Sequence, residues 1–152
     1  MHEYRMEHLF SYSASLKPPE VIAPLPEGAR ATFYIGGGTV RGRRLNGRMQ
    51  AVGADWFLLR RDGVGQLDVR TTLESDDGAL IYASYSGLAD LGEEGYERFL
   101  RGELPPKLKL RTTPVLRTAH PDYQWLHRLL CVGVGEADLG KLEVAYDVYA
   151  VS

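Results

Sequence analysis

The segment Gln66–Glu74 carries the side chains with the clearest chemical potential in this 152-residue chain. Apolar and polar residues alternate along it, as is typical of a β-strand with two different faces. Asp68 and Arg70 share the polar face. If that face lines a cavity, the Arg70 guanidinium can hold a substrate carboxylate or carbonyl through two hydrogen bonds, while Asp68 moves a proton. If the face meets solvent, the two residues form a weak surface ion pair. The alternation leaves both interpretations open.

The partner of Arg70 on the next strand depends on the turn at Asp77-Gly78. With a tight turn, Arg70 lies across from Tyr85. With a loop one residue longer, it faces Ser84 and has Tyr82 as a neighbour. A one-residue change of register reverses the direction of every side chain. Tyr82 and Tyr85 are therefore both candidates for a phenol that stabilises developing oxyanion charge.

Five more residues are candidates for the same site. Asp55 would act as a general base if burial raised its pKa, although Asp is also a common turn residue. Trp56, Tyr123 and Trp125 could form an apolar wall for a ring-shaped ligand, or could belong to the core or an interface. Arg111 is a candidate for anion binding, although its place in an alternating segment also fits the surface.

Metal and cofactor chemistry have little support in the sequence. The histidines lack the close spacing of helical zinc ligands: His2, His8, His120 and His127. The single cysteine, Cys131, lies in an apolar run and is expected to be a core residue. The glycines at 36–42 precede no helix that could hold a phosphate, and no serine hydrolase motif is present. We therefore expect neither a metal nor a cofactor.

The composition excludes several partners. Eighteen Lys and Arg against twenty Asp and Glu give a net charge of −2, which provides no basic field for nucleic acid. No run approaches the 18 or so apolar residues of a membrane helix, and the first residues lack the apolar segment of a signal peptide. We expect a cytoplasmic protein that binds neither nucleic acid nor a membrane.

Period-two alternation recurs along most of the chain and predicts strands at 8–16, 31–35, 39–43, 47–52, 56–61, 66–75, 79–88, 107–113, 129–135 and 142–149. Asp62-Gly63 and Asp77-Gly78 supply the positive φ angles of hairpin turns. Gly36-Gly37-Gly38 suits a bulge or corner. The prolines between 18 and 26 predict a long loop. Short helices are expected at Glu93–Arg101 and 121–129.

Short antiparallel strands in about this number fit either a sandwich or a barrel, in one domain spanning residues 1–152. An eight-stranded barrel is just wide enough to hold one small ligand. The architecture therefore decides whether the polar residues above can form a site.

Several short motifs occur in a recognisable order: Gly53-Ala54-Asp55-Trp56, Leu67-Asp68-Val69-Arg70, Asp77-Gly78-Ala79-Leu80-Ile81-Tyr82, Arg111-Thr112-Thr113-Pro114 and Pro121-Asp122-Tyr123-Gln124-Trp125-Leu126. In this order and spacing the chain resembles the domain of unknown function 3237 family, also called uncharacterised protein family 0311, over about residues 7–151. The resemblance implies a closed antiparallel eight-stranded barrel of the allene-oxide-cyclase or lipocalin-like kind, often oligomeric. It implies little about the reaction, because fold does not fix function.

Two functions follow from these features. The first is a cofactor-independent enzyme of lyase, isomerase or cyclase type, in which Asp55 or Asp68 moves a proton while Arg70 and a tyrosine stabilise oxyanion charge. The second is a non-catalytic barrel that binds a small molecule. A solid, side-chain-filled barrel would instead indicate a structural or interaction protein. A homodimer or larger homo-oligomer is expected, because small barrels rich in aromatics often bury some of them between subunits.

Overall fold

The alternating segments form strands that make up most of the computed structural model, which describes residues 1–152. The elements in chain order are β1 (Met6–Leu16), β2 (Glu20–Leu25), β3 (Gly28–Gly42), β4 (Gly47–Met49), β5 (Ala54–Arg60), β6 (Val64–Ser75), β7 (Leu80–Asp90), α1 (Gly95–Leu100), β8 (Lys107–Arg117), η1 (Pro121–Arg128), β9 (Leu130–Asp138) and β10 (Glu143–Val151).

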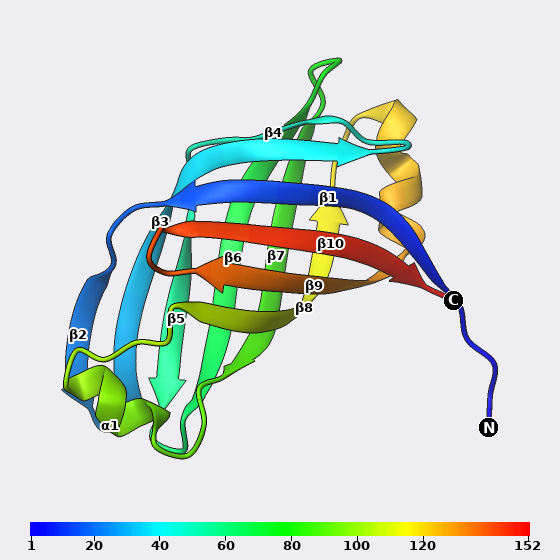
Figure 1. Ribbon diagram of the computed structural model, residues 1–152. Helices are drawn as coiled ribbons and strands as arrows, with labels where there is room; N and C mark the ends of the chain where they lie inside the picture. Colours follow the sequence, from blue (N-terminus) through cyan, green and yellow to red (C-terminus); the bar gives the residue numbers. More distant parts are fainter.

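Eight strands close into an antiparallel barrel in the order β1, β10, β9, β8, β7, β6, β5 and β3, and β3 completes the circle by pairing with β1 (Figure 1). A row of directly paired residues starts on β3 at Arg41, crosses each of the other barrel strands in turn and returns to β3 at Arg30. This offset along one strand tilts the strands against the barrel axis, as closure requires. The closed eight-stranded barrel is confirmed.

Two further strands extend the sheet. β4 pairs with β3 and β6 beyond the end of β5, so β4 and β5 occupy successive parts of the same gap. β2 forms where the prolines predict a loop, and that prediction is wrong for Glu20–Leu25. β2 pairs only with β3. An edge strand tolerates Pro24, because the missing N–H is needed by no second neighbour.

The glycine-containing turns are as predicted. Gly63 and Gly78 both have positive φ in the hairpins β5–β6 and β6–β7. Gly36 is an extra residue opposite the Ser15–Leu16 step of β1, which makes it a bulge. The β6–β7 hairpin adopts the longer-loop register, with Arg70 opposite Ser84.

The inner face of the barrel is apolar and forms one core cluster, which includes Cys131 as expected. His8 is an exception to the alternation of β1. A register shift between His8 and Phe10 turns the histidine outward, where its Nε2 lies 2.9 Å from the Ser11 hydroxyl oxygen. His8 therefore lies outside the core.

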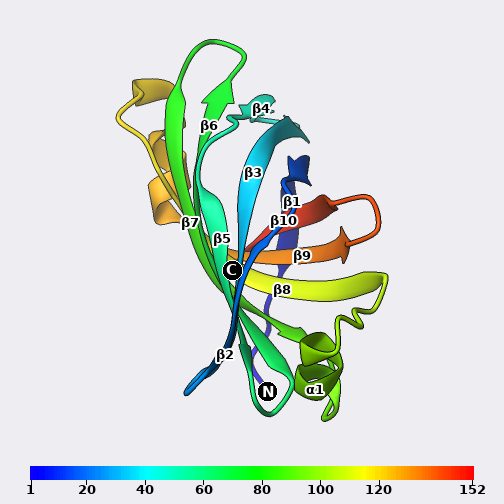
Figure 2. The ribbon, with the colours of Figure 1, turned by 90° about the vertical axis from the view of Figure 1, so that its left-hand side faces the viewer.

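Both predicted helices are present, the second as a 3₁₀ helix. Figure 2 shows α1 at one end of the barrel and η1 beside β7 at the opposite side. Neither is a long apolar helix that could span a membrane.

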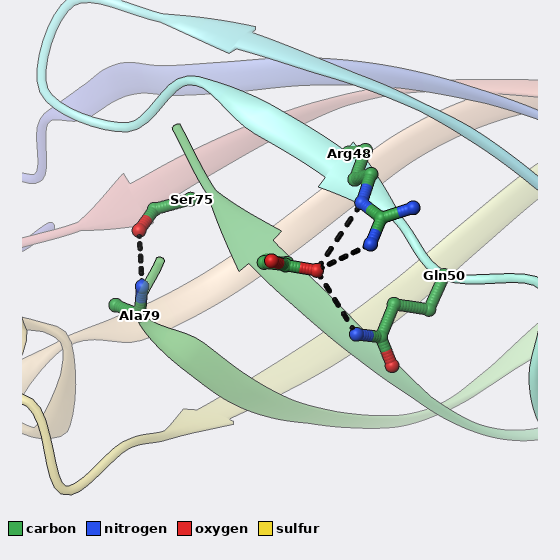
Figure 3. Close-up of polar contacts among 5 residues, drawn as sticks. Arg48, Gln50, Ser75 and Ala79 are labelled. Carbon is green, nitrogen blue, oxygen red and sulfur yellow. Dashed lines mark hydrogen bonds and ion pairs between the residues drawn. The ribbon is translucent and has the colours of Figure 1, made fainter. Parts of the chain in front are cut away.

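Near its turn, the β6–β7 hairpin makes polar contacts with residues in and just after β4 (Figure 3). Arg48 Nη2 and Gln50 Nε2 donate to one carboxylate oxygen of Glu74, at 2.6 and 3.1 Å. The Arg48 hydrogen bond also holds the pKa of Glu74 below its usual value. At the tip, the Ala79 N–H donates to the Ser75 hydroxyl at 2.8 Å. The contact between Ser75 and Ala79 accompanies the hairpin register that orients Tyr85.

Adjacent residues on β7 provide a test of which face is the core. Ile81 is completely buried, whereas Leu80 is 58% exposed. We expect Ile81→Ala to lower the free energy of unfolding by about 2–5 kcal/mol, because it removes buried methylene groups and leaves a cavity. Leu80→Ala should change it by less than about 0.5 kcal/mol. Urea denaturation measures both, and equal losses would contradict the assigned faces.

Candidate functional site

A cavity inside the barrel is lined by residues from β1, β3 to β10 and the segment containing α1. Its lining side chains are apolar or aromatic with the single exception of Asp55. An isolated carboxyl group among apolar side chains has an altered proton affinity. The cavity is therefore the place in this molecule where unusual acid–base chemistry is best supported.

Asp55 reaches the cavity because of its place in β5. It shares the inward face with Phe57 and Leu59, while Ala54 and Trp56 lie on the other face. The main-chain N–H of Asp68 donates to Asp55 Oδ1 at 3.0 Å. Burial raises the pKa of Asp55 from 3.8 to about 7, and the Asp68 N–H opposes that rise. The carboxyl group can thus gain or lose a proton near neutral pH.

Three tyrosines from separate strands gather beside Asp55. Tyr12 donates its hydroxyl hydrogen to the Tyr85 oxygen at 2.9 Å. Tyr146 stacks on Tyr12, with ring centroids 5.0 Å apart, and meets Tyr85 edge-on at 5.9 Å. Burial raises the pKa of all three, and the charge of Asp55 contributes to each rise. The phenols therefore stay neutral, and Tyr85 keeps a hydrogen to donate to a ligand oxygen.

Apart from Asp55 and the three tyrosines, the lining of the cavity is wholly apolar. Leu91, Phe99 and Leu104, in the segment that contains α1, face Phe33 and Phe57 from the barrel wall. The cavity volume is about 70 Å³. Because ligand pockets generally exceed about 300 Å³, an organic ligand would need side chains or this segment to move.

The structure places Asp68 and Arg70 on the outer surface. Leu67 and Val69 turn inward into the core, so their polar neighbours must face solvent. Arg70 Nη2 lies 3.7 Å from Asp68 Oδ2, and both side chains are at least half exposed. The Arg70 guanidinium also stacks over Trp56 at 4.4 Å, which places Trp56 outside as well. The surface interpretation of this strand is the correct one.

Four other predicted residues also lie outside the cavity. Tyr82 is 49% exposed, because the longer-loop register directs it outward. Arg111 alternates outward from the buried Leu110. Tyr123 and Trp125 belong to η1. The Tyr123 hydroxyl donates to Asp77, and the Trp125 ring packs under the Arg44 guanidinium. A luminal position for these four is wrong, and of the predicted residues only Asp55 and Tyr85 line the cavity.

Tyr12 and Tyr146 were not predicted as site residues. Each lies on the apolar face of its strand, and they are directly paired across β1 and β10. A phenol on an otherwise apolar face was a usable signal, because a buried hydroxyl generally finds a polar partner.

Away from the cavity, one group of side chains has the chemistry to hold a metal ion. The candidate ligand atoms of Asp77, His120 and Asp122 lie within 4.8 Å of one another. Two of these residues are exposed, and Asp77 already accepts hydrogen bonds from Ser75 and Tyr123. The cluster is fully explained by contacts between the β6–β7 hairpin and η1.

The chain belongs to the family described as Protein of unknown function (DUF3237), whose model matches residues 4–151. A UPF0311 protein of Rhodopseudomonas palustris is 32% identical over 147 residues, which cover 95% of each chain. A UPF0311 protein of Clostridium acetobutylicum is 31% identical over 134 residues, or 85% of each.

Solved structures share the architecture. A protein of unknown function from Clostridium acetobutylicum matches with a TM-score of 0.88 at 28% identity, covering 99% of this chain and 100% of that one. A beta-barrel like protein from Acinetobacter baumannii matches with a TM-score of 0.82 at 31% identity, covering 100% of this chain and 98% of that one. An enzyme from Penicillium herquei matches with a TM-score of 0.70 at 18% identity, covering 100% of this chain and 97% of that one. This likeness shows a common fold alone.

The raised pKa of Asp55 makes a prediction about stability. Between about pH 4 and 7 the folded protein keeps a proton that the unfolded chain has lost, so stability must fall as pH rises through this window. Asp55→Asn carries no charge and avoids that loss. We expect D55N to match the wild type near pH 4 and to exceed it by at most about 4 kcal/mol at pH 8.

Chemical denaturation across this pH range measures the difference. The matched control is Asp68→Asn, on the outer surface, which should keep the wild-type pH dependence. A wild-type protein whose stability is flat from pH 4 to 8 would show that Asp55 is not buried as described.

Proposed function

We propose that this protein is a cofactor-independent enzyme that transfers a proton to or from a small molecule held inside the barrel. The observation that carries the proposal is the position of Asp55, whose burial raises its pKa to about 7 beside three neutral phenols. A general acid or base works best when its pKa is near the working pH. Lyase, isomerase and cyclase reactions all include such a step.

The phenols provide the second requirement of the chemistry. Removing a proton next to a carbonyl, or adding one to a double bond, places charge on an oxygen or carbon of the substrate. Tyr85 can donate its hydrogen to that oxygen because its own oxygen already accepts from Tyr12. In this proposal Asp55 moves the proton, Tyr85 stabilises the oxygen, and Tyr12 orients Tyr85.

The lining of the cavity supports one class of substrate. No Lys, Arg or His lines it, so a carboxylate or phosphate would be buried without a counter-charge. The apolar part near Phe33, Phe57 and Phe99 suits a hydrocarbon or ring portion. We therefore propose an uncharged, largely apolar substrate with one carbonyl or hydroxyl group pointing to Tyr85.

The small volume implies that the barrel opens to admit this substrate. The segment from Leu91 to Leu104 closes the apolar part of the cavity, and Gly92 and Gly102 lie near its ends with positive φ. A Cβ at either glycine would meet no neighbouring heavy atom within 4 Å, although the Gly92 carbonyl lies close to Gly63. They are suitable hinges for a movement of the segment.

The decisive measurement is proton exchange in heavy water. We expect a panel of uncharged cyclic ketones and enones to contain compounds that gain deuterium next to the carbonyl in the presence of the protein, followed by NMR. Asp55→Asn should lower the rate by at least about 100-fold, since general acid–base groups contribute roughly that much. Tyr85→Phe should lower it less, because one donor of the oxygen is lost.

Arg70→Ala is the matched control, because Arg70 lies outside the barrel. It should leave exchange unchanged. Equal rates for wild type and D55N on every compound that binds would remove the catalytic role, and loss of exchange in R70A would place the reaction on the outer face.

A non-catalytic binding protein is the second candidate. The apolar lining supports it, since such a pocket holds a ligand by excluding water. Binding without exchange, retained in D55N, would distinguish this function from catalysis.

We also propose a homodimer or larger homo-oligomer. The outer surface exposes large apolar side chains on neighbouring strands, including Tyr82, Val115 and Leu130. Contact between copies would cover them. Light scattering at micromolar concentration should give at least twice the monomer mass of 16.9 kDa, and Leu130→Glu should reduce it. A monomer mass for the wild type would contradict this proposal.

A further inference from the structure

The hydrogen-bond ladder between β5 and β6 has a gap beside Asp55. The two strands pair at Ala54–Arg70 and Asp55–Val69, and again at Leu58–Gln66, but not between these points. The register places Trp56 opposite Asp68 in the gap. Two residues that face each other in a hydrogen-bonded pair normally exchange both of their main-chain hydrogen bonds.

Both halves of the missing rung have other partners. The Asp68 N–H points toward β5 but donates to the Asp55 carboxylate, at 3.0 Å. The Trp56 carbonyl, which a regular ladder would offer to that N–H, accepts from Arg30 Nη1 at 3.2 Å. Arg30 comes from β3, where it is paired with Leu58, so its side chain crosses the outer face of β5.

We propose that Arg30 is a positioning residue, which occupies the Trp56 carbonyl, keeps this rung open and thereby directs the Asp68 amide to the Asp55 carboxylate. The inference rests on the proposed function only in giving Asp55 a role. Without Arg30, the Trp56 carbonyl loses the side-chain donor that it has in the structure, and a hydrogen bond from the Asp68 N–H, which closes the rung, is the most direct replacement. Closure would withdraw the amide from Asp55.

The Asp68 amide is the one hydrogen-bond donor that Asp55 has in the structure. The other groups that act on Asp55 are the phenols of Tyr12, Tyr85 and Tyr146 inside the barrel, and the Asp68 carboxylate on the outer side. The amide stabilises the charged carboxylate and also fixes its rotamer, whereas the Asp68 carboxylate opposes the charge. Arg30 therefore tunes a group inside the barrel from a position on its outer face.

The test uses NMR on the intact chain. The pH midpoint of Asp55 is read from its side-chain carboxyl carbon, and the Asp68 amide proton is followed in the same titration. In the wild type, that amide proton should shift with the Asp55 midpoint. In Arg30→Met it should stop following Asp55, and the midpoint should rise by about one pH unit as the carboxylate loses its donor.

Two variants serve as controls. Arg30→Lys keeps a donor for the Trp56 carbonyl and should restore most of the wild-type behaviour. Arg70→Met removes another arginine from the same outer face, which stacks on Trp56, and should change neither signal. If R30M does not fold, Arg30→Leu provides the same test.

The outcomes separate this inference from the proposed function. An R30M protein with the wild-type midpoint and an Asp68 amide that still follows Asp55 would overturn the role of Arg30 alone. A wild-type midpoint near 4 would instead remove Asp55 as an acid–base group at neutral pH, and an Asp68 amide that ignores its titration would remove the hydrogen bond on which the inference depends.

Discussion

Closure of the sheet is the constraint on which the rest of this structure depends. A closed barrel has one interior, and each strand commits every second residue to it. In β5, Phe57 and Leu59 point into the barrel, and Asp55 points the same way because it lies two residues before Phe57. The carboxyl group is thus buried by its position in the strand, and its altered proton affinity is a consequence of the fold.

The same alternation explains how far sequence reasoning could reach. For β6 it separated Leu67 and Val69 from Asp68 and Arg70 correctly, but which face lay inside required knowing that the barrel interior is apolar. The apolar set of a strand belongs in the core unless a large polar lumen exists. Asp68 and Arg70 have side chains suited to catalysis, but they follow that rule and lie on the outer surface.

Contacts between distant strands set the remaining limit. The phenols come from β1, β7 and β10, and their meeting depends on the circular strand order and on the pairing of Tyr12 with Tyr146. Local sequence determines neither. The orientation of Tyr85 depends on one residue in the length of the Asp77-Gly78 loop, and the longer form is the one in which Ser75 and Ala79 are hydrogen-bonded across the turn. The hairpin register therefore depends on tertiary interactions, which a local hairpin motif does not encode.

Asp68 illustrates how a residue can matter to a site that its side chain does not enter. Its carboxylate lies outside beside Arg70, while its main-chain N–H serves Asp55 on the inside. A β-strand makes this division natural, since the backbone lies between two faces and can pass a constraint from one to the other. The outer surface around Trp56 and Arg30 is thereby part of the environment of the luminal acid. A sequence motif that includes this strand therefore contains a main-chain contact to Asp55, even though its charged side chains point away from the cavity.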